Sequence, residues 1–176
     1  MAGRAAHVLY VIAPERFRDE ELLEPQRALE AAGHRVTVAS TRSGTATGML
    51  GARVAVTATL REARAEDFDL LAFAGGAGSP AHLWESEDAV RLVKAVYGRG
   101  RPVAAICLSP PVLARAGVLA GKRATVYPES RAIIEMKRGG ATLVDEAVVV
   151  EGIVVTARGP EASPAFCAAL VNLLGP

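Results

Sequence analysis

Several segments of the chain are almost continuously apolar, and each has the length of a buried strand. They are rich in Val, Ile and Leu, which favours β-structure over helix. The predicted strands are His7–Ala13, Val36–Ala39, Leu70–Phe73 and Val103–Ile106, followed by a pair, Val148–Val150 and Ile153–Thr156. Because their apolar residues are continuous rather than alternating, we expect helices to cover both faces of the sheet.

Between these strands the apolar residues recur at helical spacing. The predicted helices are Glu20–Ala32, Ser86–Tyr97, Pro110–Ala116, Ser130–Lys137 and Pro160–Leu174. Gly33 and Gly98 stand at the ends of two of them, where glycine commonly terminates a helix. Strand and helix therefore alternate, which predicts an α/β fold, a three-layer αβα sandwich with a mostly parallel sheet.

Two segments depart from this alternation. Thr41–Thr59 contains three glycines among small and polar residues and predicts a loop with a short hairpin. Asp145–Arg158, with Glu151 and Gly152 at its centre, predicts a second hairpin at one edge of the sheet. Internal repeats and linker-like stretches are missing from the sequence, so residues 1–176 are expected to form a single domain.

Composition narrows the function classes. The 176 residues are 51% hydrophobic, and 20 basic residues balance 19 acidic ones for a net charge of +1. This balance disfavours nucleic acid and anionic lipid as partners. No stretch approaches the ~20 apolar residues of a membrane span, and the first apolar segment is too short for a secretion signal, which predicts a cytoplasmic protein.

Cysteine is the chemically most informative residue type. The two cysteines, Cys107 and Cys167, are too few for a disulfide framework or a zinc cluster, so neither is expected. Cys167 lies in the apolar last helix, where packing is the simplest role. Cys107 follows a predicted strand and precedes a helix whose N-terminal N–H groups would lower a thiol pKa. It is either a reactive thiol on a strand-to-helix elbow or a small buried apolar residue.

The turns after Ala13, Phe73 and Ile106 leave the sheet at the carboxyl edge, where such folds bind ligands. The second turn holds Gly75 and Gly76. The pattern G-x-G-x-x-A starts at Gly76, but an interrupting proline and the lack of a ribose-binding acid after the next strand argue against a dinucleotide site. The two glycine amides, with that of Leu108, could form an oxyanion hole, or the glycines could serve a plain tight turn.

A thiolate nucleophile usually works with a neighbouring base or acid. Of the three histidines only His82 follows the Gly75 turn closely, and it is either a participant or a surface residue. The run from Arg16 to Leu22 contains three acids that begin a helix, where acids usually complement the helix dipole. If the first and fourth strands are neighbours, one of these acids could reach the sulfur.

Together these features resemble the ThiJ/PfpI superfamily, which includes the parkinsonism-associated protein deglycase and archaeal PfpI-type intracellular proteases. The resemblance extends from Val8 to Leu174. Its landmarks are Phe17–Leu22 with Pro25, Val36–Ser40, Ala74–Gly76, Ala104–Cys107, Ala116–Leu119 with Gly121 and Lys122, Tyr127 with Pro128, and Ala157–Pro160.

The resemblance implies a flavodoxin-like sandwich, a reactive cysteine at Cys107 on a strained elbow, and a glutamate at Glu21 that hydrogen-bonds to the sulfur. It also carries over the amides of Gly75 and Gly76. A protonated Glu21 would donate to the thiolate, which requires a raised glutamate pKa. The family generally works without a cofactor and forms homodimers or larger rings, so at least a dimer is expected.

Three positions depart from the family pattern. Leu108 stands where the protease-like branch carries histidine, which disfavours a peptidase. Tyr127 stands near the position of a histidine in the deglycase branch, and a phenol is a poor base near neutrality. Arg18 replaces a second acid of PfpI-type proteins.

The leading hypothesis is a glyoxalase/deglycase-type enzyme that acts on methylglyoxal, glyoxal or their adducts. Cys107 would add to the aldehyde, Glu21 would move the proton, and Tyr127, Arg18 and His82 are further candidates for substrate contact. Two alternatives remain. One is a redox-responsive stress protein based on oxidation of Cys107, and the other is a C–N hydrolase of the amidase or peptidase type.

Overall fold

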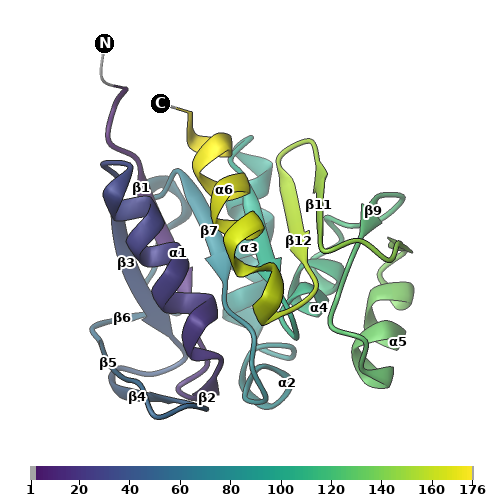
Figure 1. Cartoon of the computed structure of the whole chain (residues 1–176), viewed down its shortest axis with the longest axis horizontal. Coiled ribbons are helices and arrows are strands. Elements are labelled where there is room, and N and C mark those ends of the chain that lie inside the picture. Colours follow the sequence, from purple (N-terminus) through teal and green to yellow (C-terminus); the bar gives the residue numbers. More distant parts are fainter. Residues whose placement is uncertain (1–2, 176) are drawn as a thin grey trace.

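Residues 3–175, which the computed structural model describes, build a seven-stranded sheet at the centre of the fold (Figure 1). The strand order is β11-β12-β8-β7-β1-β3-β6, and every neighbouring pair is parallel except β11 with β12. The strands are β1 (His7–Val11), β3 (Arg35–Ser40), β6 (Ala58–Thr59), β7 (Leu70–Phe73), β8 (Val103–Ile106), β11 (Val148–Glu151) and β12 (Val154–Ala157). The mostly parallel sheet predicted from the sequence is confirmed.

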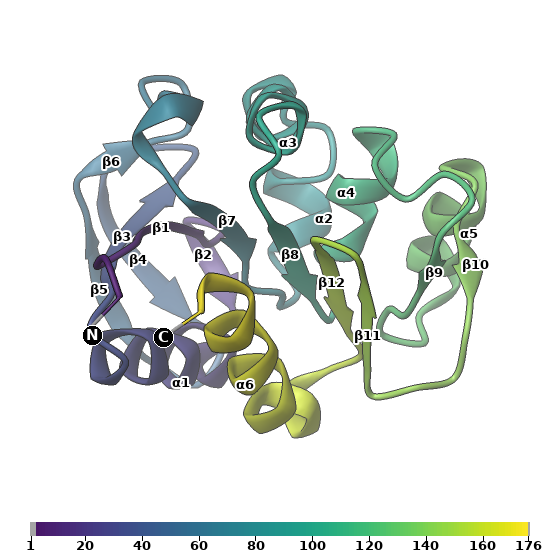
Figure 2. The ribbon, with the colours of Figure 1, turned by 90° about the horizontal axis from the view of Figure 1, so that it is seen from above.

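Helices cover both faces of this sheet, which gives the predicted three layers (Figure 2). On one side lie α1 (Asp19–Ala31) and α6 (Ser163–Leu174). On the other lie α2 (Ser79–His82), α3 (Glu87–Gly98) and α4 (Pro110–Arg115), with α5 (Ser130–Arg138) packed against α4 beyond the sheet's edge. Each layer encloses its own apolar core, and both cores include strand residues that have no exposed surface.

Short strands supplement the main sheet. The predicted hairpin within Thr41–Thr59 is present as β4 (Gly44–Gly48) and β5 (Arg53–Val56), joined by β2 (Glu15–Phe17), which the sequence did not indicate. Two further strands that were not predicted, β9 (Arg123–Ala124) and β10 (Thr142–Leu143), pair with each other. All are only two to five residues long, which is too short for an apolar pattern to indicate a strand.

Some predicted boundaries are wrong. The first strand ends at Val11 instead of Ala13, and the last helix begins with a 3₁₀ turn, Pro160–Ala162, before α6. The first and fourth strands of the sequence analysis, β1 and β8, are not neighbours because β7 lies between them. The acid of α1 must therefore cross the end of β7 to reach Cys107.

The carboxyl ends of β1, β7 and β8 meet at one edge of the sheet, as predicted, while the start of β1 and the end of α6 lie at the opposite edge (Figure 1). Within residues 3–175, no helix is both long enough and apolar enough to cross a membrane.

Replacing Phe166 with Ala tests the core between α6 and the sheet. The Phe166 side chain is fully buried in this layer, so the cavity should lower the free energy of unfolding by about 3–5 kcal/mol. Val150, 53% exposed on β11, provides the control, and its change to Ala should cost about 1 kcal/mol or less. Urea unfolding of both variants measures the difference, and equal losses would contradict the assigned core.

Candidate active site

Cys107 occupies the turn between β8 and α4 in a strained backbone conformation. Its φ is 64°, and Arg16 with φ 57° is the other non-glycine residue of positive φ among residues 3–175. The main chain of Cys107 is fixed on both sides: its N–H donates to Ala157 O at 2.9 Å, and its carbonyl accepts from Tyr127 N at 2.9 Å. These contacts hold an unfavourable conformation of the main chain beside the pocket that Cys107 lines. The side chain is only 5% exposed.

The turn after β7 brings Gly75 and Gly76 against this elbow. A Cβ on Gly75 would lie 2.6 Å from the Cys107 Cβ and 2.8 Å from Glu21 Oε1, so only glycine fits between those side chains. Gly76 has φ 111°, and a Cβ there would meet Arg18 N at 2.4 Å. Because these two glycines have no side chain, Glu21 can reach the sulfur although β7 separates β1 from β8.

Glu21 lies in the first turn of α1 and is fully buried. Its Oε1 accepts the N–H of Gly75 at 3.0 Å. Its Oε2 is buried with no hydrogen-bond partner of good geometry among the described residues, and the Cys107 thiol is the polar side chain that interacts with the carboxyl. A carboxyl in this setting carries an oxygen available to exchange a proton with sulfur.

The backbone of Glu21 is anchored from the core. Pro25 stands inside α1, four residues later, and has no N–H to donate to the Glu21 carbonyl. The hydroxyl of Tyr10, a fully buried residue of β1, donates to that carbonyl at 2.6 Å instead. The proline thus leaves the Glu21 carbonyl free to accept the Tyr10 hydrogen bond, which connects the start of α1 to the sheet.

Electrostatics keep the Glu21 carboxyl protonated near neutrality. Burial is the largest influence and raises its pKa to about 8, while the hydrogen bond from Gly75 and the interaction with the Cys107 thiol oppose that rise. The raised glutamate pKa expected from the family resemblance is therefore present.

The expected lowering of the Cys107 pKa is not found. Burial and the charge of an ionised Glu21 raise the pKa of the thiol, while the N–H groups of Gly76 and Leu108 lower it by a smaller amount. Because one of the raising influences requires ionised Glu21, the two groups titrate as a pair. The pKa of the thiol is therefore lower when Glu21 is protonated than when Glu21 is ionised.

The three backbone amides predicted to form an oxyanion hole, those of Gly75, Gly76 and Leu108, do not all bind the same partner. The Gly75 N–H is taken by Glu21, so it is not free for a substrate oxygen. The N–H groups of Gly76 and Leu108 face the sulfur instead. The Leu108 carbonyl accepts from the indole of Trp84 at 2.6 Å, which fixes the orientation of that peptide group.

Buried hydroxyls fasten the elbow to the glycine turn. Ser109 Oγ donates to Ala74 O at 2.5 Å, and Ser79 Oγ lies 3.0 Å from Ser109 Oγ. Both serines are fully buried. These bonds join the segments that carry the Leu108 and Gly76 amides, and sequence reasoning did not single out either serine.

A pocket of about 480 Å³ opens at Cys107. The pocket is lined by Leu108, Gly76 and Tyr127, three of the residues that the sequence analysis named as site candidates. His82 does not line it. Its ring instead lies 3.1 Å from Glu15 Oε1, outside the residues that line the pocket.

Arg18, the last candidate for substrate contact, also lines the pocket. Its guanidinium is already paired, donating to Glu20 at 2.6 and 3.0 Å. The hydrogen bonding between the two side chains raises the pKa of Arg18 and lowers that of Glu20. The pair therefore presents little net charge to a ligand.

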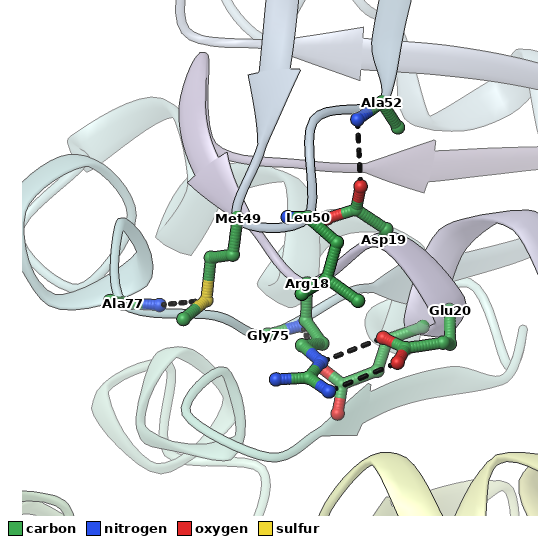
Figure 3. A network of polar contacts seen from close by, with 9 residues as sticks. Arg18, Asp19, Glu20, Met49, Leu50, Ala52, Gly75 and Ala77 are labelled. Atoms are coloured by element: carbon green, nitrogen blue, oxygen red, sulfur yellow. Dashed lines mark hydrogen bonds and ion pairs between the residues drawn. The ribbon is translucent and has the colours of Figure 1, made fainter.

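The tip of the β4–β5 hairpin forms one wall that the sequence did not reveal (Figure 3). The carboxylate of Asp19 accepts Leu50 N at 2.9 Å and Ala52 N at 2.8 Å, which ties the tip to the start of α1. Met49 reaches over the pocket, and its sulfur accepts Ala77 N at 3.4 Å. Asp19 belongs to the acidic run that the sequence analysis considered, but it braces this wall instead of facing sulfur.

Pro160 and Glu161, in the 3₁₀ turn before α6, complete the pocket and were also missed. Cys167 is buried in α6, and burial together with the nearby Glu24 charge raises its pKa to about 11. Among residues 3–175, no three His, Cys, Asp or Glu side chains are grouped as metal ligands.

Known proteins resemble this chain in both sequence and structure. Residues 6–173 match the model of the DJ-1/PfpI family. A deglycase of Pyrococcus horikoshii is 38% identical over 95% of this chain and 98% of its own, and General stress protein 18 of Bacillus subtilis is 38% identical over 89% and 91%. A ThiJ/PfpI domain protein of Brachyspira murdochii has a similar structure, with a TM-score of 0.91, 34% identity and 98% coverage of both chains.

Replacing Gly75 with Ala tests the close approach at the elbow. The added Cβ should push Cys107 and Glu21 apart, lowering stability by about 1–3 kcal/mol and changing the alkylation rate of Cys107. Gly98→Ala is the matched control, because nothing lies within 4 Å of a Cβ there. Iodoacetamide labelling followed by peptide mass analysis distinguishes Cys107 from Cys167. A Gly75→Ala protein with wild-type stability and labelling would refute the packing.

Glu21→Gln tests the buried acid through pH. The folded pKa of Glu21, about 8, exceeds its ordinary value of 4.5, so its stabilising contribution is complete below about pH 4.5 and is lost as pH rises through 8. Gln carries no such proton. The melting temperature of wild type relative to Glu21→Gln should therefore fall between about pH 5 and pH 9. Parallel melting curves across that range would contradict the raised pKa.

Proposed function

The chain belongs to the DJ-1/PfpI family, and on that premise we propose that it is a cysteine-dependent enzyme of the deglycase type. Its substrates would be methylglyoxal, glyoxal or the early adducts that these dicarbonyls form with thiols and amines. Relatives named as deglycases, such as the Pyrococcus horikoshii protein, support the reaction class.

The observation that carries the proposal is the buried pair of Cys107, which lines a 480 Å³ pocket, and Glu21, whose carboxyl interacts with the thiol. The sulfur supplies a nucleophile, and a carboxyl with a pKa of about 8 is available in both protonation states near neutrality. Proton transfer to and from carbon requires such a group within reach of the reacting centre.

The first step would be addition of the thiol to the aldehyde of methylglyoxal. A C–S bond forms at the aldehyde carbon, and the thiol proton passes to the former carbonyl oxygen, which gives a hemithioacetal. The N–H groups of Gly76 and Leu108, which face the sulfur, are placed to stabilise charge on that oxygen.

Glu21 in its carboxylate form would then take the proton from the sulfur-bearing carbon and return it to the neighbouring carbon. The hydroxyl proton of the first carbon passes to the ketone oxygen. The first carbon is thereby oxidised to a thioester while the ketone is reduced to an alcohol, so no external oxidant is needed. Water finally cleaves the thioester and releases lactate and the free thiol. The sum is methylglyoxal plus water to lactate, and an adduct additionally frees the thiol or amine that carried it.

Tyr127 and Arg18 would orient the substrate from the pocket walls. A C–N hydrolase receives less support, because Leu108 offers no base beside the cysteine. The redox alternative has one specific observation in its favour: General stress protein 18 of Bacillus subtilis is a 38% identical relative. In that role Cys107 would be oxidised to sulfenic or sulfinic acid by peroxide.

Methylglyoxal turnover tests the proposal, with D- and L-lactate assayed separately. Cys107→Ala should reduce kcat/KM by roughly three orders of magnitude, and Glu21→Gln by roughly a hundredfold or more. Cys167→Ala, which changes the buried cysteine of α6, is the control and should retain turnover. Wild type should be more active as pH rises through about 8, because ionised Glu21 accepts the carbon-bound proton.

Wild-type turnover equal to that of Cys107→Ala would overturn the enzyme proposal. Stoichiometric oxidation of Cys107 by dilute peroxide, followed by intact mass analysis, would then support the redox alternative.

A further inference from the structure

The rim of the Cys107 pocket carries a carboxylate that the proposed reaction does not use. Glu161 lines the pocket, is exposed, and makes no ion pair or side-chain hydrogen bond within residues 3–175. Arg18, the basic residue of the same pocket, is paired with Glu20 at 2.6 Å. Since Glu20 offsets the charge of Arg18, Glu161 is the charged residue of the pocket lining whose charge no ion pair among the described residues offsets.

The carboxylate lies next to an aromatic ring. The point where a Cβ on Gly159 would stand is 3.2 and 3.4 Å from the two oxygens of Glu161 and 3.4 Å from the ring carbon Cδ2 of Tyr127. The Tyr127 ring also lines the pocket and is 42% exposed. Gly159 thus leaves the space in which the carboxylate and the ring come together.

A carboxylate beside an exposed aromatic ring attracts cations in two ways. The carboxylate pairs with a positive charge, and the ring's electron-rich face binds ammonium and guanidinium groups. A neutral dicarbonyl has no group for either interaction. An anionic substrate would meet uncompensated negative charge.

We propose that Glu161, together with the ring of Tyr127, selects substrates that carry a positive charge near the reacting carbonyl group. The inference rests on the proposed deglycase function and deepens it: the preferred substrates would be dicarbonyl adducts on cationic molecules. The thiol or amine that carries the adduct would lie at the rim, while its carbonyl group reaches Cys107. Glu161 acts here in substrate binding and not in the chemical step.

The test compares hemithioacetals that methylglyoxal forms with three capped dipeptides, acetyl-cysteinyl-trimethyllysine amide, acetyl-cysteinyl-glutamine amide and acetyl-cysteinyl-glutamate amide. Trimethyllysine keeps its charge and does not react with the aldehyde. In wild type, kcat/KM should be greatest for the cationic adduct and least for the anionic one. Glu161→Gln should shrink the cationic-to-neutral ratio by about fivefold, through KM more than kcat.

Salt and a matched variant separate charge recognition from general damage. Raising NaCl to about 0.5 M should reduce the wild-type preference, because the rim is exposed and screened. Glu151→Gln, an acid on β11 at the opposite end of the sheet from Cys107, should leave the ratio as in wild type.

Equal kcat/KM for the three adducts in an active wild type, or an unchanged ratio in Glu161→Gln, would overturn the inference while the deglycase function stands. Loss of turnover on all three adducts in wild type, the same as in Cys107→Ala, would instead remove the function on which the inference rests.

Discussion

The site depends on a carboxyl group that is removed from water and placed against a sulfur atom. Burial of Glu21 makes its ionisation costly, and the Gly75 N–H stabilises its position without abolishing that cost. The surrounding features serve this juxtaposition. Two glycines let the turn after β7 pass close to the acid and the thiol, and Tyr10 binds the carbonyl that Pro25 leaves free. A polar group in this position stays satisfied only while several separate elements remain packed.

The three-layer fold could be predicted from the sequence because buried parallel strands carry long apolar runs. Val103–Ile106 and Leu70–Phe73 were identified to the residue. Cys107 was recognisable from its place at the end of one such run. Its link to Glu21 came from family resemblance, since the three acids that begin α1 look alike in sequence. Only tertiary structure shows that Asp19 binds the hairpin, Glu20 binds Arg18, and Glu21 enters the core.

What sequence reasoning missed came from segments with little pattern of their own. The tip of the β4–β5 hairpin is positioned by main-chain bonds to Asp19, which any residue at positions 50 and 52 other than proline could make. Glu161 is separated from Cys107 by 54 residues and meets it only because β12 pairs with β8. The prediction that the helix terminus lowers the Cys107 pKa was also wrong. It considered the local dipole but not burial, which raises the pKa.

The left-handed backbone of Cys107 has an evolutionary consequence. Glycine, and to a lesser degree asparagine, adopts that conformation more readily. A cysteine there therefore lowers the free energy of unfolding by about 1 kcal/mol relative to glycine at the same position. Mutations that relax the elbow would be favoured by folding alone. A lineage in which the thiol had no use would drift toward those residues, so the residue kept at this position would report whether its chemistry is in use.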